Sequence, residues 1–272
     1  MLITSYGAHK MKVENGIHAI TNEQYHSSEG ISRSDLMRFK KSPMHFKHKQ
    51  SLKETSSLII GELVHTLVLE PLFFNDRYII NPGFDRRTKD GKAGYAEFQI
   101  ISEGKKIIEG NLYDEAKRIA DSVNNHEFKQ HMQKDYYFEK SIYFEHKLTG
   151  LQCKVRPDAW LGDVVIDLKT TVDASFRSFQ SSAYKYGYYL QAGMIKRALE
   201  SLNTHIKNFI FVAVEKEAPY AIGIYKLDDE ALDYGANEFD TLMIDLQKYI
   251  ERDEFPDYGI QTLSMPSWLK TE

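Results

Sequence analysis

Hydrophobic and polar positions along the chain predict helices in its first half and strands in its centre. Residues 1–30 are polar and weakly patterned, so no element is predicted there. Residues 31–49 read as two short helices separated at Pro43, because proline suits the opening turn of the second helix. Ser32 or Ser34 can cap the first helix.

Residues 56–74 are apolar on nearly all helical faces, and Pro71 ends the pattern. A helix of this kind is buried rather than amphipathic, so we expect it in the core. Residues 81–95 carry glycines and cations but few apolar side chains, which predicts a basic, mobile loop. Two further helices are expected over residues 93–106 and 111–126.

From Tyr136 onward the pattern changes to short segments rich in β-branched and aromatic residues. Gly150 and Gly162 separate these segments, as is typical of turns between strands. We therefore expect a three-stranded antiparallel meander. Its strands lie within residues 136–147, 151–157 and 163–170.

A long helix over residues 183–201, strands over 208–216 and 220–227, and a C-terminal helix over 228–251 complete the pattern. Strands and helices intermixed in this way predict an α/β fold with a mixed, twisted central sheet flanked by helices. No internal repeat or linker divides the chain. We therefore expect residues 1–272 to form a single domain.

Composition and charge narrow the classes of function. The chain has 272 residues, 42% of them hydrophobic, which is normal for a protein with its own core. A net charge of −4 disfavours a protein that coats nucleic acid nonspecifically, although a local basic channel remains compatible. A single cysteine, Cys153, excludes an internal disulfide, an iron–sulfur cluster and a cysteine-rich zinc site.

Two further absences in the sequence shape the expectation. The opening residues lack the long apolar core of a signal peptide, and no run approaches the roughly 18 apolar residues of a membrane helix. We therefore expect a soluble, cytoplasmic protein that does not bind a membrane. The chain also lacks a G-x-x-x-x-G-K-[ST] segment, so it encodes no ATP-driven motor.

Two carboxylates and a lysine lie close together in the predicted meander. Asp158 ends one strand and Asp167 ends the next, so antiparallel pairing can place the two side by side. Lys169 shares a face with Asp167 because side chains alternate along a strand. The carboxylates and the Leu168 carbonyl offer the hard oxygen ligands that Mg²⁺ or Mn²⁺ prefers. The lysine could orient or deprotonate an attacking water and offset charge on a phosphate.

This order of residues, P-D followed by D-x-K, resembles the signature of the PD-(D/E)xK nuclease superfamily. Other segments resemble the exonuclease VIII group of phage and prophage recombination exonucleases and, more distantly, lambda-type exonuclease. These segments are ISRSDLMRFKKSPMHF, GELVHTLVLEP, DRRTKDGKAGYAEF, RPDAW, VIDLKTTVDAS, YYLQAGM and PSW, within roughly residues 25–268. The resemblance implies a restriction-endonuclease-like core. It also implies a metal-dependent exodeoxyribonuclease that resects linear duplex DNA from 5′ to 3′ for recombination by single-strand annealing.

The resemblance implies roles for residues outside the motif. His65 would complete the metal coordination begun by the two aspartates and the Leu168 carbonyl, although a lone histidine in an apolar helix is usually a core residue. Gln191 lies where related nucleases place a glutamine that contacts DNA or its 5′ end, and it joins the catalytic set. Ile195 stands where many relatives carry a tyrosine. Glu62, one helical turn before His65, could serve a second metal through water or simply face solvent.

Candidate DNA contacts carry cationic or hydroxyl side chains. Duplex DNA presents about one phosphate charge per 1.7 Å, although charge runs are often only solvated surfaces. Ser34 resembles a serine that binds the terminal 5′-phosphate in related exonucleases, and Thr170 and Thr171 could donate to phosphate or cap a turn. The cationic candidates are Arg86, Arg87, Lys89 and Lys92, with Arg38, Lys40 and Lys41 nearer the N-terminus. The tyrosines at positions 184, 186, 188 and 189 either pack at a helix start or serve the site.

The resemblance also implies a ring-shaped homo-oligomer that encircles DNA, with a tetramer favoured, and a single-strand annealing protein as partner. Two alternatives remain open. One is a restriction- or repair-type endonuclease with the same metal site, which would cut a closed circle as well as a linear molecule. The other is a catalytically silent module that binds DNA ends or partners, against which the intact Asp158, Asp167 and Lys169 argue.

Overall fold

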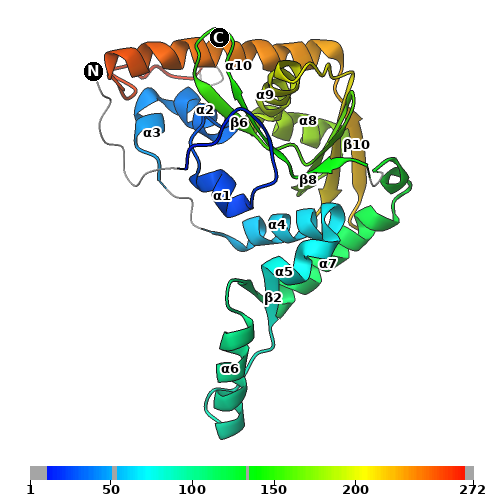
Figure 1. Ribbon diagram of the computed structural model, residues 1–272. Coiled ribbons are helices and arrows are strands. Elements are labelled where there is room, and N and C mark those ends of the chain that lie inside the picture. Colours follow the sequence, from blue (N-terminus) through cyan, green and yellow to red (C-terminus); the bar gives the residue numbers. More distant parts are fainter. Residues whose placement is uncertain (1–10, 51–53, 133–134, 267–272) are drawn as a thin grey trace.

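The computed structural model describes residues 11–50, 54–132 and 135–266, and its centre is a five-stranded mixed sheet (Figure 1). The strand order is β10-β9-β8-β7-β4, in which β8 and β9 are parallel and the other neighbours are antiparallel. The strands are β4 (Tyr137–Phe138), β7 (Ala159–Leu161), β8 (Val164–Thr171), β9 (Asn208–Glu215) and β10 (Ile222–Lys226). The predicted mixed sheet is therefore confirmed.

The prediction of a three-stranded meander is wrong, because two of its strands belong to a second sheet. Strands β1 (Gly16–His18), β5 (Ser141–Glu145) and β6 (Gln152–Val155) form an antiparallel sheet of their own. After β6 the chain passes through Pro157 into β7 of the five-stranded sheet. Proline has no backbone N–H to donate to a ladder, which disfavours an extension of β6 through this position.

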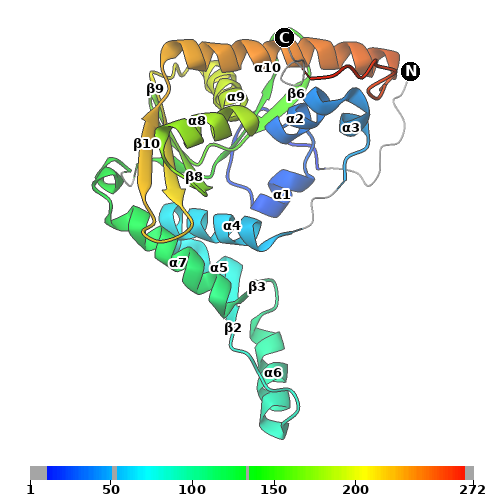
Figure 2. The ribbon, with the colours of Figure 1, turned by 180° about the vertical axis from the view of Figure 1, so that it is seen from behind.

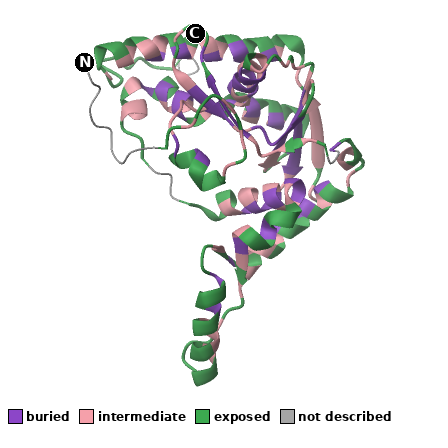
Figure 3. Ribbon diagram, viewed as in Figure 1, coloured by how far each residue is buried: buried purple, intermediate pink, exposed green. Residues whose placement is uncertain are grey.

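The helices cover both faces of the five-stranded sheet (Figures 1 and 2). One group of helices packs on the face of β8 that carries Val165. The other group packs on the opposite face, which carries Ile166 and Leu168. The first group is α2 (Arg33–Lys41), α9 (Tyr188–Ser201) and α10 (Asp229–Arg252). The second group is α4 (Ser56–Leu69) and α7 (Gly110–Asn125). Figure 3 shows buried residues concentrated on the strands between these helices.

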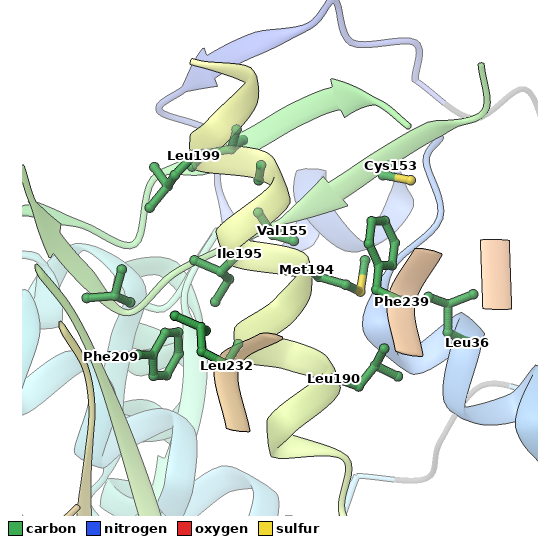
Figure 4. Packing of buried hydrophobic residues seen from close by; sticks show 14 of the residues in the cluster. Leu36, Cys153, Val155, Leu190, Met194, Ile195, Leu199, Phe209, Leu232 and Phe239 are labelled. Carbon is green, nitrogen blue, oxygen red and sulfur yellow. The ribbon is translucent and has the colours of Figure 1, made fainter. Parts of the chain in front are cut away.

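The first hydrophobic cluster fixes the helix that follows the central strands. Leu190, Met194 and Ile195 of α9 are all buried, with Phe209 of β9 and Phe239 of α10 beside them (Figure 4). Ile195 is thus a core side chain in this protein.

Helix ends in the N-terminal part follow the local signals. Ser32 caps α2 by accepting from the Asp35 N–H, while Asp35 accepts from the Ser32 N–H at 3.0 Å. Ser42 caps α3 (Pro43–Lys47), and Pro43 occupies its first turn. The two short helices are confirmed, and Ser32 rather than Ser34 is the cap. Elements also form before residue 31, namely β1 and α1 (Asn22–Ser27), where no element was predicted.

The predicted basic loop is wrong in its second half, because α6 (Lys89–Ile101) begins inside it. The Thr88 side chain caps this helix by accepting from the Gly91 N–H at 3.0 Å, and Phe84 packs on Tyr95 and Phe98. The helix lies on an arm that projects away from the sheets (Figure 1). Strands β2 (Tyr78–Asn81) and β3 (Lys106–Glu109) pair in parallel at the base of the arm, and α5 (Phe74–Arg77) precedes them.

The helix predicted over residues 183–201 is in fact two helices. Helix α8 (Phe176–Lys185) ends before Gly187, which adopts a left-handed conformation with φ of 68° and precedes α9. A side chain at Gly187 would also meet Met37, since an added Cβ would lie 2.5 Å from its Sδ. Only glycine suits such a position without strain.

Two observations complete the fold. Along the described chain, no single helix is long and apolar enough to cross a membrane. Only α4 and the segment Pro71–Arg77 together reach the necessary length and apolar composition, and the two are bent by 119° relative to each other. The N-terminal residues 1–10 and most of the closing PSW segment lie outside the described residues.

Candidate active site

The two motif aspartates lie side by side where β7 begins next to β8. Ala159 pairs with Ile166, so Asp158 lies next to Asp167 across the β7–β8 ladder. The Asp158 Oδ2 atom accepts a hydrogen bond from the Leu168 N–H at 2.7 Å. Asp167 lies in the middle of β8, not at a strand end, and its side chain is fully buried. The strand that pairs with β8 across the short turn is β7, whereas the sequence pattern had predicted residues 151–157 as the neighbour.

Lys169 and Gln191 both contact Asp167. Lys169 shares a strand face with Asp167, and its Nζ forms an ion pair with Asp167 Oδ1. The same Nζ lies 5.0 Å from the centre of the Tyr188 ring. Gln191 Nε2, from the first turn of α9, donates to Asp167 Oδ2 at 2.6 Å. Gln191 Oε1 is buried without a hydrogen-bond partner among the described residues, so one polar acceptor of the site is free.

On the other side of the site, His65 lies with two carboxylates. Its Nδ1 is 3.6 Å from Asp158 Oδ2 and 3.5 Å from Glu139 Oε1. One ligand atom from each of the three residues lies within 4.8 Å of the others, a grouping able to hold a metal ion. The His65 side chain is 26% exposed. It therefore differs from a fully enclosed core histidine.

Glu139 is a site residue that the sequence did not indicate. It follows β4 in a left-handed conformation, with φ of 49°, and its N–H donates to the Asp158 carbonyl at 3.0 Å. Its other carboxylate oxygen accepts from Arg156 Nε at 2.8 Å. Glu139 lies in an aromatic-rich segment and belongs to no recognisable motif, so the sequence alone offered no reason to select it. Glu139 reaches the site only because the chain passes from one sheet to the other there.

The electrostatics of this group indicate an excess of negative charge. Burial alone lowers the pKa of His65, but Asp158 and Glu139 outweigh it and raise the pKa to about 9. Burial and the charges of Asp167 and Glu139 together raise the pKa of Asp158 to about 7, although the charges of His65 and Lys169 oppose this rise. A group that retains protons so strongly favours a cation at the same place.

The donor set fits a divalent metal. One imidazole nitrogen and carboxylate oxygens are ligands that first-row divalent ions accept, with carboxylates suiting Mg²⁺ and Mn²⁺. The Leu168 N–H points to Asp158. Because the N–H and C=O of one residue in an extended strand point to the same side, the Leu168 carbonyl also faces the side of Asp158. Of the four expected ligands, His65 and Asp158 lie in the metal group with Glu139. Asp167 lies beside it, held by Lys169 and Gln191.

Glu62 is held by two residues of the arm. Its carboxylate accepts from the Tyr78 hydroxyl at 2.8 Å and from Lys106 Nζ at 2.7 Å. These partners belong to the two strands at the base of the arm. Glu62 therefore joins α4 to the arm one helical turn from His65.

The candidate DNA contacts are scattered over the surface. Arg86 stacks on Tyr95 at 4.5 Å and Arg87 pairs with Asp85 at 2.9 Å, while Lys89 and Lys92 lie on α6 (Figure 1). These four residues lie on or beside the arm, which projects away from the sheet that carries Asp167 (Figure 1).

Candidates nearer the site have mixed environments. Thr170 lies against Gly61 of α4, and Ser34 is exposed in the first turn of α2. Arg38 pairs with Asp35 at 3.3 Å. Lys40 pairs with Glu238, Lys41 is exposed, and Thr171 donates to the Asp173 carbonyl at 3.2 Å. Among the tyrosines, Tyr188 faces Lys169, Tyr189 contacts Tyr234, and Tyr184 and Tyr186 are exposed.

Comparison with known proteins agrees with this geometry. A family model described as a PDDEXK-like domain of unknown function (DUF3799) matches residues 32–263. No curated protein matches the chain.

Solved structures extend the comparison. The chain is similar to the crystal structure of a protein from Eubacterium rectale described as a proposed exonuclease, with a TM-score of 0.60 and 14% identity. That match covers 92% of this chain and 96% of the other. At this identity it shows a shared fold alone. A second structure, SSO0001, has a TM-score of 0.29 at 14% identity over 77% of this chain and 86% of its own, which is too low for any argument.

Proposed function

Because this chain belongs to the family of PDDEXK-like domains of unknown function (DUF3799), within the PD-(D/E)xK nuclease superfamily, we propose that it is a metal-dependent exodeoxyribonuclease. The observation that carries the proposal is the convergence of Asp158, Asp167 and Lys169 beside the His65 and Glu139 donors. Acids around a cation site with an adjoining lysine are the groups that phosphodiester hydrolysis needs. A silent binding module has no physical need for this arrangement.

His65, Asp158 and Glu139 would hold the cation, with Asp167 and the Leu168 carbonyl beside them. A divalent cation at this place supplies positive charge to the phosphate and lowers the pKa of water. Mg²⁺ is our first choice because carboxylates dominate the donor set, and Mn²⁺ is the alternative because it accepts imidazole more readily.

Lys169 acts as a cation in this mechanism. Burial lowers the pKa of Lys169, but Asp167 and Asp158 outweigh burial and keep it above its ordinary value. The side chain is therefore an ammonium at neutral pH. It can donate to the attacking water or to a phosphate oxygen, but it cannot accept the proton of the water. This favours the orienting role over the general-base role that the sequence also allowed.

Gln191 and Asp167 complete the arrangement. The amide of Gln191 holds one oxygen of Asp167, which fixes the carboxylate against Lys169. Its free Oε1 can accept a hydrogen bond from water or from a sugar hydroxyl. Water attacks phosphorus in line with the leaving oxygen, the P–O3′ bond breaks and the proton passes to that oxygen. The products are a 3′-hydroxyl and a 5′-phosphate.

The finer parts of the proposal concern substrate form and assembly. We propose that the protein resects linear duplex DNA from its ends, from 5′ to 3′, and passes the 3′-ended strand to a single-strand annealing protein in the cytoplasm. A ring-shaped homo-oligomer, with a tetramer as first choice, would keep the protein on DNA without an ATPase. The support for these points is the resemblance of the ordered segments to exonuclease VIII-type nucleases. Light scattering that shows a monomer, together with processive digestion, would refute the ring.

One experiment tests the proposed function. An end-labelled linear duplex and the closed circle of the same sequence are incubated with the protein in Mg²⁺, in Mn²⁺ and with chelator. We expect metal-dependent loss of the linear molecule and survival of the circle. Cleavage of both identifies an endonuclease. Binding of ends without cleavage in either metal identifies the silent module.

A further inference from the structure

Arg33, the first residue of α2, lies beside the site although it offers no metal ligand. Its Nη1 donates to the Tyr186 carbonyl at 2.5 Å. Tyr186 and Gly187 form the break between α8 and α9, and Met37 of α2 lies against that glycine. The start of α2 is therefore attached to the segment that positions the first turn of α9, from which Gln191 reaches Asp167.

The guanidinium also lies within electrostatic range of the catalytic lysine. Burial lowers the pKa of Lys169, Asp167 and Asp158 raise it, and the charge of Arg33 opposes that rise. The contacts agree, because the Tyr186 ring is 6.1 Å from the Tyr188 ring, over which Lys169 lies. The two cations are thus linked through Tyr186 and Tyr188.

Arg33 has no carboxylate partner within the described parts of the chain. Arg38, Arg156 and Arg197, by contrast, each pair with an acid at 3.3 Å or less. A cation at the first position of a helix is opposed by the helix dipole, and Lys169 adds repulsion. The Tyr186 carbonyl at the end of α8 favours the cation through one donor, whereas the α2 dipole and Lys169 oppose it. An anion bound to the remaining donors would offset both opposing effects.

We propose that Arg33 binds a backbone phosphate of the DNA strand, adjacent to the phosphate that is hydrolysed. The inference rests on the proposed function, because it requires DNA in the site. One guanidinium donor is held by the Tyr186 carbonyl, which leaves others of its five N–H groups for two oxygens of one phosphate. Lys169 serves the scissile phosphate, so the two cations hold successive positions of the strand.

The test compares Arg33→Ala and Arg33→Lys with Arg252→Ala, which removes an exposed arginine at the end of α10. Figure 1 places α10 on the opposite side of the sheet from α4. Steady-state cleavage of a short linear duplex is measured over a range of salt concentrations. Arg33→Ala should raise KM roughly 10- to 100-fold, the range for losing a charged hydrogen bond, with kcat changed much less. The slope of log(kcat/KM) against log[salt] should fall by about 1.

Arg33→Lys separates charge from geometry. It should keep the wild-type salt slope and show a KM between those of the wild type and Arg33→Ala, because lysine retains the charge but not the planar pair of donors. Arg252→Ala should match the wild type in both measurements. If Arg33→Ala does not fold, the KM of folded Arg33→Lys decides, and an unchanged value overturns the inference.

The possible failures are distinguishable. If the wild type cleaves DNA but Arg33→Ala keeps its KM and salt slope, the inference is wrong and the proposed function stands. A loss in kcat alone also overturns it, because Arg33 would then act only by holding the α8–α9 break. If the wild type cleaves no DNA in either metal, the proposed function fails and the inference fails with it.

Discussion

We predict that the ionisation of His65 makes metal binding depend on pH. Only the neutral imidazole can bind a metal, and Asp158 and Glu139 raise the pKa of His65 to about 9 although burial opposes them. At pH 7 about 1% of the metal-free protein therefore has a neutral His65. The apparent metal affinity should be about 100-fold weaker at pH 7 than above pH 9, with about tenfold per pH unit between them.

The carboxyl of Asp158 adds a second proton at lower pH. Its pKa is about 7, raised by burial and by Asp167. Below pH 7, two protons compete with the metal, so the affinity should fall more steeply than tenfold per unit. Cleavage should fall with it, and a higher metal concentration should partly restore cleavage at low pH.

Isothermal titration calorimetry in two buffers of different ionisation enthalpy measures the protons released on metal binding. The wild type should release about one proton at pH 8. His65→Ala should release fewer, and the remainder comes from Asp158, which has lost the imidazolium that lowers its pKa. Above pH 9 the variant should bind metal about one to two orders of magnitude more weakly than the wild type. His205→Ala, which removes an exposed histidine, is the matched control and should behave as the wild type.

Two results would refute this reasoning. The first is a wild type that binds metal at pH 8 without releasing protons. The second is a His65→Ala variant that loses thermal stability but keeps the affinity and proton release of the wild type. In either case His65 is a core histidine and not a ligand.

Three further predictions test the site and the packing behind it. Lys169→Ala should abolish cleavage but retain metal binding in calorimetry, because the ammonium acts on water and phosphate; cleavage near the wild-type rate would contradict the mechanism. Asp167→Ala should lose both cleavage and metal affinity, and unchanged metal binding would remove it from the ligands. Gly193→Ala should lower the free energy of unfolding in urea by about 1–3 kcal/mol, because its Cβ would lie 2.1 Å from the Gly235 carbonyl carbon. Gly61→Ala is the control, since its Cβ meets nothing closer than 3.6 Å and should not destabilise.

Much of the site could be predicted because its geometry is local. Asp167 and Lys169 share a face on any strand that contains both, and Asp158 lies nearby whenever a short turn brings a neighbouring strand back. Burial of α4 follows from its composition, which also places His65 next to the core. The proximity of Asp158, Asp167 and Lys169 therefore needed no knowledge of the rest of the chain.

Other parts of the site depend on distant segments. Glu139 enters the metal group because β4 pairs with β7 while β5 pairs with β1 and β6, a division that the alternation of either strand does not encode. Glu62, equally acidic and on the face of α4 near His65, is instead taken by Tyr78 and Lys106 of the arm. Nothing in the local sequence distinguishes Glu139 from Glu62 as a member of the site.

The sequence by itself determined what depends on neighbouring residues: a serine cap for α2, Pro43 in the first turn of α3, the stop of α4 before Pro71, the apolar strands and the spacing of Asp158, Asp167 and Lys169. Only the tertiary structure decided which sheet each strand joins, where the helix after β8 breaks, and that His65 meets Glu139. The reason is physical. Caps, breakers and strand alternation act over a few residues, whereas strand pairing and the pKa of a buried group depend on surfaces and charges brought together from distant parts of the chain.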